Sequence, residues 1–424
     1  VNDHLGQGQG IQFGKKDCEW YIRAYPSKPF LTFQVVYVNT GKSPVRVEKL
    51  IPWAVGEPRS GYVSLGPGAA DVCILENGRL FRGFNDYPEV SKGKSFSQYN
   101  LAAFNPATGR SLIAGFLTNL IAYTQIVMER SDAAPENGFD LFRAECVYDP
   151  PVEVQPGERL QSEVLYLGIL ERNPFDGLER YGKAVAVMNG VHDERPFMPN
   201  GWDSWNTHYH THIDEASMLA NLDYIDANLK RFGWTHFAID AGWERGLGDW
   251  EPNPERFPHG MKYMADEIHK RGMKASIWLD PFTIRNDSDF AKAHPDWLMQ
   301  PQGVGRFVIG NDKSVLDPSH PEAYAYLKDL THKICVEWGF DGLAEADFVY
   351  YLLAAGPYHD PKMTKVEIQR LGMRALREGM GLDKSMVTMT PQPINAVYAQ
   401  CIRVGRDCSP IWRGTNINEK WGCV

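Results

Sequence analysis

Two aspartates of this 424-residue chain stand where a catalytic pair is expected. Asp347, in DGLAEADFVYY, and Asp407, in IRVGRDCSP, each follow an apolar run typical of a β-strand and precede a loop. In α/β barrels the chemistry is carried by residues at the C-terminal ends of the strands. Two carboxylates in such positions suit acid/base catalysis, or a nucleophile that works with an acid/base partner.

The elements that must position this pair form an alternating series in the second half of the chain. Six strand candidates alternate with segments of helical periodicity: NGWDSW, HFAID, KASIWLD, FDGLAEADF, MVTMT and IRVG. Such alternation predicts a parallel sheet with right-handed crossovers. No glycine-rich phosphate turn follows the first strand, which favours a (β/α)8 barrel over a doubly wound sheet.

The first 190 residues have a different pattern. Short alternating or apolar runs, such as FLTFQVVYVN and RLQSEVLYLGIL, are separated by turn clusters such as NTGKSP and VQPGE. This pattern is typical of an antiparallel β-sandwich. The sequence therefore predicts a β-sandwich over residues 1–190, followed by a (β/α)8 TIM barrel over residues 191–424. Since only about six βα units are present, we expect the barrel to be incomplete at its C-terminal end.

Composition limits the classes of partner. The net charge of −9, without a Lys/Arg cluster, argues against nucleic acid, and no apolar run reaches the ~18 residues of a membrane span. The seven cysteines lack metal-ligand spacing, and His208, His210 and His212 lack a fourth ligand cluster. We therefore expect a soluble protein with no cofactor and no metal. A cytoplasmic, periplasmic or secreted location, and a homo-oligomer, are left open by the sequence.

Between Asn200 and Trp412 the chain resembles the α-galactosidases of glycoside hydrolase clan D, and the melibiase-like family 36 more closely than family 27. The motifs that carry the resemblance follow one another in order: NGWDSW, IDAGWERGLGDW, IWLDPFTIRNDSDFAKAHPDW, ADF and RVGRDCSPIW. The most specific are HPDW with the preceding DSD, and RxGxD followed by Pro and Trp. The resemblance implies a β-sandwich before a barrel, and a retaining glycosidase that forms a glycosyl-aspartate intermediate.

The resemblance also implies roles for individual residues. The nucleophilic aspartate of the family's KxDF motif falls on Asp347, and the general acid/base of its RxGxD motif falls on Asp407. The arginine of that motif, Arg403, contacts the nucleophile region or the sugar. Retention requires two carboxylates about 5–5.5 Å apart. The nucleophile would have to be ionised, with a pKa kept low by a cation such as Arg403, while Asp407 would have to hold a proton.

Five further residues are expected to contact the sugar by the same analogy. Asp240 would hydrogen-bond hydroxyl groups, and Trp278 would form a stacking platform, with Trp205 and Trp243 as further aromatic candidates. Thr388 takes a sugar-contact position on the fifth strand. A capping carboxylate and core tryptophans are the structural alternatives for these residues.

The chain departs from the family pattern beside the nucleophile. Ala241 replaces the second of two adjacent aspartates, and Glu345 replaces the lysine two residues before Asp347. The segment DGLAEADF is also one residue longer than the pattern, so Ala344 is an alternative match for that lysine. In either alignment a cation is missing. We therefore expect an altered specificity, for a galactoside, an N-acetylgalactosaminide or a modified sugar, with Glu345 in contact with it.

Three functions remain open at this point. The leading interpretation is a retaining α-glycoside hydrolase resembling α-galactosidases, with an oligosaccharide or α-glycoside as its partner. A transglycosylase of the same family would use the same intermediate and differ only in its acceptor. A non-catalytic carbohydrate-binding relative is the third interpretation, and the presence of both Asp347 and Asp407 argues against it.

Overall fold

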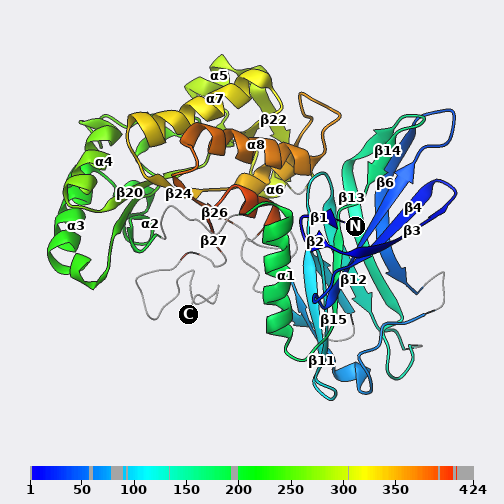
Figure 1. The fold of residues 1–424 in the computed structure, drawn as a ribbon. Helices are drawn as coiled ribbons and strands as arrows, with labels where there is room; N and C mark the ends of the chain where they lie inside the picture. Colours follow the sequence, from blue (N-terminus) through cyan, green and yellow to red (C-terminus); the bar gives the residue numbers. More distant parts are fainter. Residues whose placement is uncertain are drawn as a thin grey trace. The chain divides into compact units, whose positions relative to one another are not determined.

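The computed structural model describes residues 2–56, 61–77, 89–91, 94–132, 134–191, 199–303, 305–389, 392–403 and 407. The chain divides into two compact units, of which the first comprises Val1–His192 with Lys362–Glu367 and the second the remainder (Figure 1). Gly405, Pro410 and Trp412 of the RxGxD-Pro-Trp pattern lie outside the described residues.

The first unit is rich in short strands and ends in one helix. Its elements are β1 Asn2–Asp3, β2 Gly6–Gln7, β3 Gln9–Lys15, β4 Cys18–Ala24, β5 Phe30–Val38, β6 Val45–Val55, β7 Cys73–Glu76, β8 Glu89–Ser91, β9 Lys94–Gln98, β10 Asn100–Asn105, β11 Arg110–Phe116, β12 Tyr123–Glu129, β13 Leu141–Val154, β14 Arg159–Gln161, β15 Leu165–Glu171 and α1 Pro174–Met188.

These strands form two large antiparallel sheets. One has the order β3-β4-β5-β15-β11-β10-β7-β8, with β14 paired to β5, and the other has the order β6-β13-β12-β9. Alternate residues of β12, such as Ile126 and Met128, are buried, as expected for a strand with one face on a core. Phe33 of the larger sheet and Ala144 of the smaller one belong to the same hydrophobic cluster. The antiparallel sheets predicted for this part of the chain are therefore present.

The second unit alternates strands with helices. Its elements are β16 Gly201–Asp203, α2 Trp205–His208, α3 Glu215–Asn228, β17 His236–Ile239, β18 Glu244–Gly246, β19 Asp249–Pro252, α4 Gly260–Lys270, β20 Lys274–Leu279, β21 Thr283–Arg285, α5 Asp289–Ala293, β22 Leu298–Pro301, α6 Gly305–Val308, β23 Lys313–Leu316, α7 Pro321–His332, β24 Gly342–Ala346, β25 Ala355–Gly356, α8 Lys365–Met380, β26 Ser385–Met389 and β27 Cys401–Arg403.

Six of these strands form one parallel sheet in chain order, β16-β17-β20-β24-β26-β27. All six coincide with strands expected from the sequence. An order without reversal is that of a barrel and not of a doubly wound sheet. The described residues thus form the partial barrel that the sequence predicts, and Figure 1 shows helices α3, α4, α7 and α8 flanking its strands.

Local sequence explains why the crossover helices form. Helix α3 begins with a capping box, in which the Asp214 carboxylate accepts the Ser217 N–H at 2.7 Å. Helix α4 buries Met261, Met264 and Ile268, whose spacing places them on one face. An apolar face of this kind holds the helix against the sheet, and the ends of the strands then set the positions of the site residues. No helix among the described residues is long and apolar enough to cross a membrane.

A small antiparallel sheet, made of three strands between β20 and β24 and one strand after β24, was not expected from the sequence. It has the order β21-β23-β22-β25, and its strands are only two to four residues long, too short to show a period. The HPDW motif leads into β22. Trp297 is buried there and stacks on His294 with ring centroids 3.8 Å apart. This motif therefore has a structural role in the insertion.

Candidate active site

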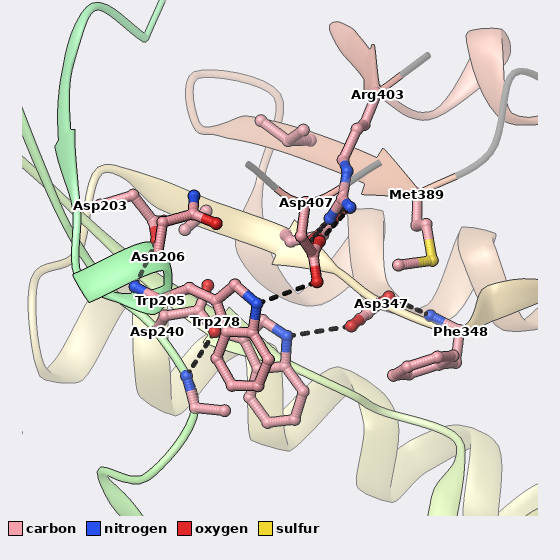
Figure 2. Close-up of a pocket in the computed structure, with 14 residues that line it drawn as sticks. Asp203, Trp205, Asn206, Asp240, Trp278, Asp347, Phe348, Met389, Arg403 and Asp407 are labelled. Atoms are coloured by element: carbon pink, nitrogen blue, oxygen red, sulfur yellow. Dashed lines mark hydrogen bonds and ion pairs between the residues drawn. The ribbon is translucent and has the colours of Figure 1, made fainter. Parts of the chain in front are cut away.

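Carboxylates gather at the C-terminal ends of the parallel strands. Asp203 is the last residue of β16, and an aspartate directly follows each of β17, β20 and β24; Asp407 comes four residues after β27. These ends share one edge of a parallel sheet. They surround a cavity of about 350 Å³, whose wall includes Asp203, Trp205, Asn206, Asp240, Trp278, Glu345, Asp347, Phe348, Arg403 and Asp407 (Figure 2).

Asp347, the expected nucleophile, is held by two neutral donors. One carboxylate oxygen accepts the Trp278 indole N–H at 3.2 Å, and the other accepts the backbone N–H of Phe348 at 2.8 Å. Phe348 has a φ of 47°, in the left-handed region that non-glycine residues rarely adopt. This backbone turn directs the N–H back at the carboxylate and also places the Phe348 ring in the cavity wall.

Asp347 is 6% exposed, and burial raises its pKa to about 7, with a further contribution from the negative charge of Asp280. The expectation of a low pKa is therefore wrong in direction. The physical reason is burial, which outweighs the positive charge of Arg403, a guanidinium whose ion pairs are with Glu345 and Asp407. The two hydrogen bonds to Asp347 lower its pKa only in part.

Asp407, the expected acid/base, lies on the same cavity. Its Oδ2 accepts the Trp205 indole N–H at 3.0 Å, and its Oδ1 accepts a hydrogen bond from Nη2 of Arg403. The other guanidinium nitrogen, Nη1, donates to the Glu345 carboxylate at 2.9 and 3.2 Å. Arg403 thus links two carboxylates that come from different strands (Figure 2).

A β-bulge explains how the additional residue of the DGLAEADF segment is accommodated. On β20, Ile277 pairs with Leu343 and Trp278 pairs with Glu345, so β24 carries one residue more than its neighbour. The ladder to β26 shifts at the same place. Ala344 is therefore the extra residue, and Glu345 keeps the paired position two residues before Asp347.

Glu345 is a buried acid in a crowded site. Burial and the charge of Asp347 together raise its pKa to about 8, although the pairing with Arg403 opposes both effects. Because a bulge turns two successive residues to the same side of a strand, Ala344 and Glu345 both line the cavity. The extra residue therefore shapes the wall beside the nucleophile.

Two more carboxylates complete the acidic wall. Asp240 is 6% exposed, and its Oδ1 accepts the Ala241 N–H at 2.7 Å. Burial and the charge of Asp203 raise its pKa well above the usual range. Asp203 accepts the Trp205 backbone N–H at 2.8 Å, and burial raises its pKa to about 6. Asp203 was not among the residues predicted from the sequence, although its position at the end of the strand in NGWDSW is equivalent to that of Asp347.

Comparisons with known proteins agree with this geometry. The Melibiase family model matches residues 178–345, which ends two residues before Asp347. An α-galactosidase of Escherichia coli is 31% identical over 41% of this chain and 25% of that protein. α-Galactosidase C of Emericella nidulans is 25% identical over 72% of this chain and 43% of that protein. The chain thus spans less than half the length of these curated relatives.

Solved structures extend the likeness to both units. An α-galactosidase from Thermus thermophilus, solved with p-nitrophenyl α-D-galactopyranoside, has a TM-score of 0.58 and 23% identity. The match covers 96% of this chain and 76% of that one, and at this identity it shows a shared fold. The chain is thus similar to the α-galactosidases of family 36.

In this family 36-like chain, two of the expected sugar contacts lie behind the cavity wall. Trp243 is fully buried, and its indole N–H donates to the Trp278 carbonyl oxygen at 2.9 Å. Thr388 is also fully buried, because side chains alternate along β26 and Val387 and Met389 face the cavity instead. The structure brings the other predicted residues together: Trp205, Asp240, Trp278, Glu345, Asp347, Arg403 and Asp407.

The three histidines near this site have separate surroundings. His208 hydrogen-bonds the His212 carbonyl oxygen and Asn221, while the ring of His210 stacks 6.2 Å from that of Trp205. Within the described part of the family 36-like chain, no group of three or more His, Cys, Asp or Glu residues is placed to hold a metal ion.

Proposed function

We propose that this chain carries the active site of a retaining α-glycosidase that hydrolyses an α-galactoside or a related α-glycoside. The observation that carries the proposal is the placement of Asp347 and Asp407. They come from different strands, line one cavity, and are each bound by an indole N–H of that cavity. The likeness to α-galactosidases supports the reaction class, and an oligosaccharide or simple α-glycoside is the proposed substrate.

The two carboxylates would divide the chemistry. Ionised Asp347 attacks the anomeric carbon while protonated Asp407 gives its proton to the departing glycosidic oxygen, which leaves a glycosyl-aspartate. Asp407, now ionised, then removes a proton from water, and the water oxygen attacks the same carbon. The bond to Asp347 breaks, Asp407 regains its proton, and the sugar keeps its α configuration.

The Trp278 and Phe348 N–H groups would assist this cycle by orienting Asp347. A carboxylate fixed by two donors needs little reorganisation before it attacks. Arg403 would orient the acid/base residue, since its Nη2 donates a hydrogen bond to Asp407. Because the cavity holds Glu345 where related enzymes have a lysine, we propose that the sugar differs from a plain galactoside or is bound differently.

The test is the nucleophile. In the full-length protein, Asp347→Asn is expected to lower the turnover of an activated aryl α-galactoside by at least about 10⁴-fold. Azide is expected to rescue Asp347→Gly and to yield the β-glycosyl azide, because it attacks from the vacated side. Asp287→Asn, which removes an exposed carboxylate from a nearby loop, serves as the control. Full activity of Asp347→Asn would overturn the assignment.

The same assay separates the other interpretations. Products formed with excess sugar acceptor distinguish hydrolysis from transglycosylation, because both share the glycosyl-aspartate. Binding of α-glycosides without turnover by the unaltered protein would identify a carbohydrate-binding relative instead.

A further inference from the structure

We propose that this cavity selects an α-glycoside whose sugar carries a protonated amine, and that Glu345 and Asp240 hold the ammonium group. The inference rests on the proposed function of the same site and names its class of substrate. Three observations support it: the balance of charge in the cavity wall, two hydrogen-bond acceptors without donors, and the surroundings of the nucleophile.

The cavity wall has a large excess of acidic side chains over basic ones. Among the described residues that line it, there are five carboxylates and one cationic side chain, Arg403. That guanidinium already forms ion pairs with both Glu345 and Asp407. Asp203 receives a backbone N–H, and Asp347 an indole and a backbone N–H, all of them neutral donors. A cationic ligand would complement this wall better than a neutral one.

Two buried acceptors face this space without a donor. Asp240 is 6% exposed and lines the cavity; its Oδ1 takes the Ala241 N–H, and its Oδ2 has no partner among the described residues. The amide oxygen of Asn206, another lining residue, is likewise buried without a described partner. Unpaired buried acceptors are costly, so a ligand that donates hydrogen bonds is expected here.

An ammonium group meets both requirements at once. It has three donors and no acceptor, whereas each sugar hydroxyl brings one donor together with two lone pairs that the carboxylates repel. Its hydrogen bonds to carboxylates are charge-assisted and about twice as strong as neutral ones. Glu345 can accept such a bond while it remains paired with Arg403, because a carboxylate has about four lone-pair sites.

The same charge would help the reaction. Burial and the charge of Asp280 raise the pKa of Asp347, which favours the protonated and unreactive form. An ammonium group beside Glu345, two residues from Asp347, would favour the ionised nucleophile. Substrate binding would thus prepare the nucleophile, and a neutral sugar would give no such help.

The experiment compares p-nitrophenyl α-galactosides that differ only in one substituent. The probes carry a hydroxyl, an acetamido group or a free amine at C2, and a hydroxyl or an amine at C6. At a pH where the amines are protonated, kcat/KM for one amino sugar is expected to exceed that for the plain galactoside by roughly 10- to 100-fold, as one charged hydrogen bond provides. The preference should decline as the pH rises through the pKa of that amine.

Variants locate the effect in the cavity. Glu345→Gln and Asp240→Asn keep the side-chain shape and remove the charge, and each should reduce the preference for the amino sugar by roughly 10-fold or more. Glu255→Gln, which changes an exposed glutamate of the same unit, is the matched control. Two cavity variants are used so that a folding failure of one leaves the other informative.

The outcomes distinguish the two levels of the proposal. Turnover of the plain galactoside that equals or exceeds that of both amino sugars overturns this inference and leaves the proposed glycosidase intact. If no probe is hydrolysed, the proposed function fails, and calorimetric binding of methyl α-galactosaminide and of its 6-amino isomer decides the inference. Binding that requires Glu345 or Asp240 supports it, and absence of binding overturns it.

Discussion

Replacing Asp280 by asparagine should make Asp347 more acidic and extend activity to lower pH. Asp280 follows β20, is 1% exposed, and is the largest influence on the pKa of Asp347 after burial. Asparagine has nearly the same shape, and its side-chain oxygen can still accept the Thr283 N–H, which lies 3.2 Å from Asp280. The substitution therefore removes a charge behind the nucleophile and leaves the cavity wall in place.

The expected size follows from the pKa of Asp347, which is raised from 3.8 to about 7. Burial causes more of this rise than Asp280 does. The pKa of Asp280 is itself raised to about 7, so this group is only partly charged near neutral pH. We therefore expect the pKa of Asp347 to fall by about one unit, which corresponds to ~1.4 kcal/mol.

The assay is the pH profile of kcat/KM, whose acid limb reports ionisation of the free enzyme. Since the nucleophile must be ionised, activity of the unaltered protein should fall as the pH drops below about 7. In Asp280→Asn the limb should move down by about one unit, while Asp287→Asn should leave it in place. A limb that stays where it was in Asp280→Asn would refute the argument, as would an unaltered protein whose limb lies near pH 4.

The same substitution should alter stability in a pH-dependent way. Burial raises the pKa of Asp280 in the folded protein to about 7, whereas its unfolded value is near 4. The folded state therefore holds this proton more tightly, and stability is lost as the pH rises through this interval, on the order of 4 kcal/mol in total. Asp280→Asn should thus resist urea better than the unaltered protein at pH 8, with a smaller advantage at pH 5.

Substitutions at three residues and one deletion test the geometry of the site. Trp278→Phe removes an N–H donor from Asp347 and should raise its pKa and lower kcat/KM by roughly 10- to 100-fold. Trp243→Phe leaves the Trp278 carbonyl without its donor and should cost about 1–3 kcal/mol in urea unfolding. Deleting Ala344 should restore regular pairing and preserve cooperative unfolding; an unfolded product would contradict the bulge assignment. Phe348→Gly should be about 1–2 kcal/mol more stable than Phe348→Ala, because both lose the ring and only alanine keeps the left-handed penalty.

The architecture of the site was largely predictable from the sequence, because the spacing of apolar residues along the chain indicates which residues are buried. Segments such as HFAID and KASIWLD are mostly apolar, as buried parallel strands are, and the aspartate at the end of each marks where the strand ends. The same rule that indicated Asp347 also indicates Asp203 and Asp280. Neither aspartate belongs to the two motifs that indicated the catalytic pair, so those motifs alone do not mark them.

The direction in which each side chain points, and the choice of partner in each ion pair, were harder to predict from the sequence. Thr388 was assigned to the sugar site by its position in the chain, yet the phase of β26 turns Val387 and Met389 inward. Trp243 follows a strand end, like Asp240, but its ring is buried against that of Trp250, 6.1 Å away. Arg403 was expected to contact the nucleophile region or the sugar and to supply a positive charge near Asp347. Only the three-dimensional arrangement shows that two other carboxylates compete for it.

One structural rule underlies both the catalytic pair and the proposed specificity. Five of the six described parallel strands have an acid at or just after the C-terminal end, and β26 does not. The barrel topology brings these ends together, so their charges repel one another: the charge of Asp280 raises the pKa of Asp347, and the charge of Asp203 raises that of Asp240. Such a site can relieve the repulsion by holding protons or by binding a cation. Protons would disable Asp347, whereas a cationic substrate would activate it, and a site built for nucleophilic chemistry therefore favours the cation.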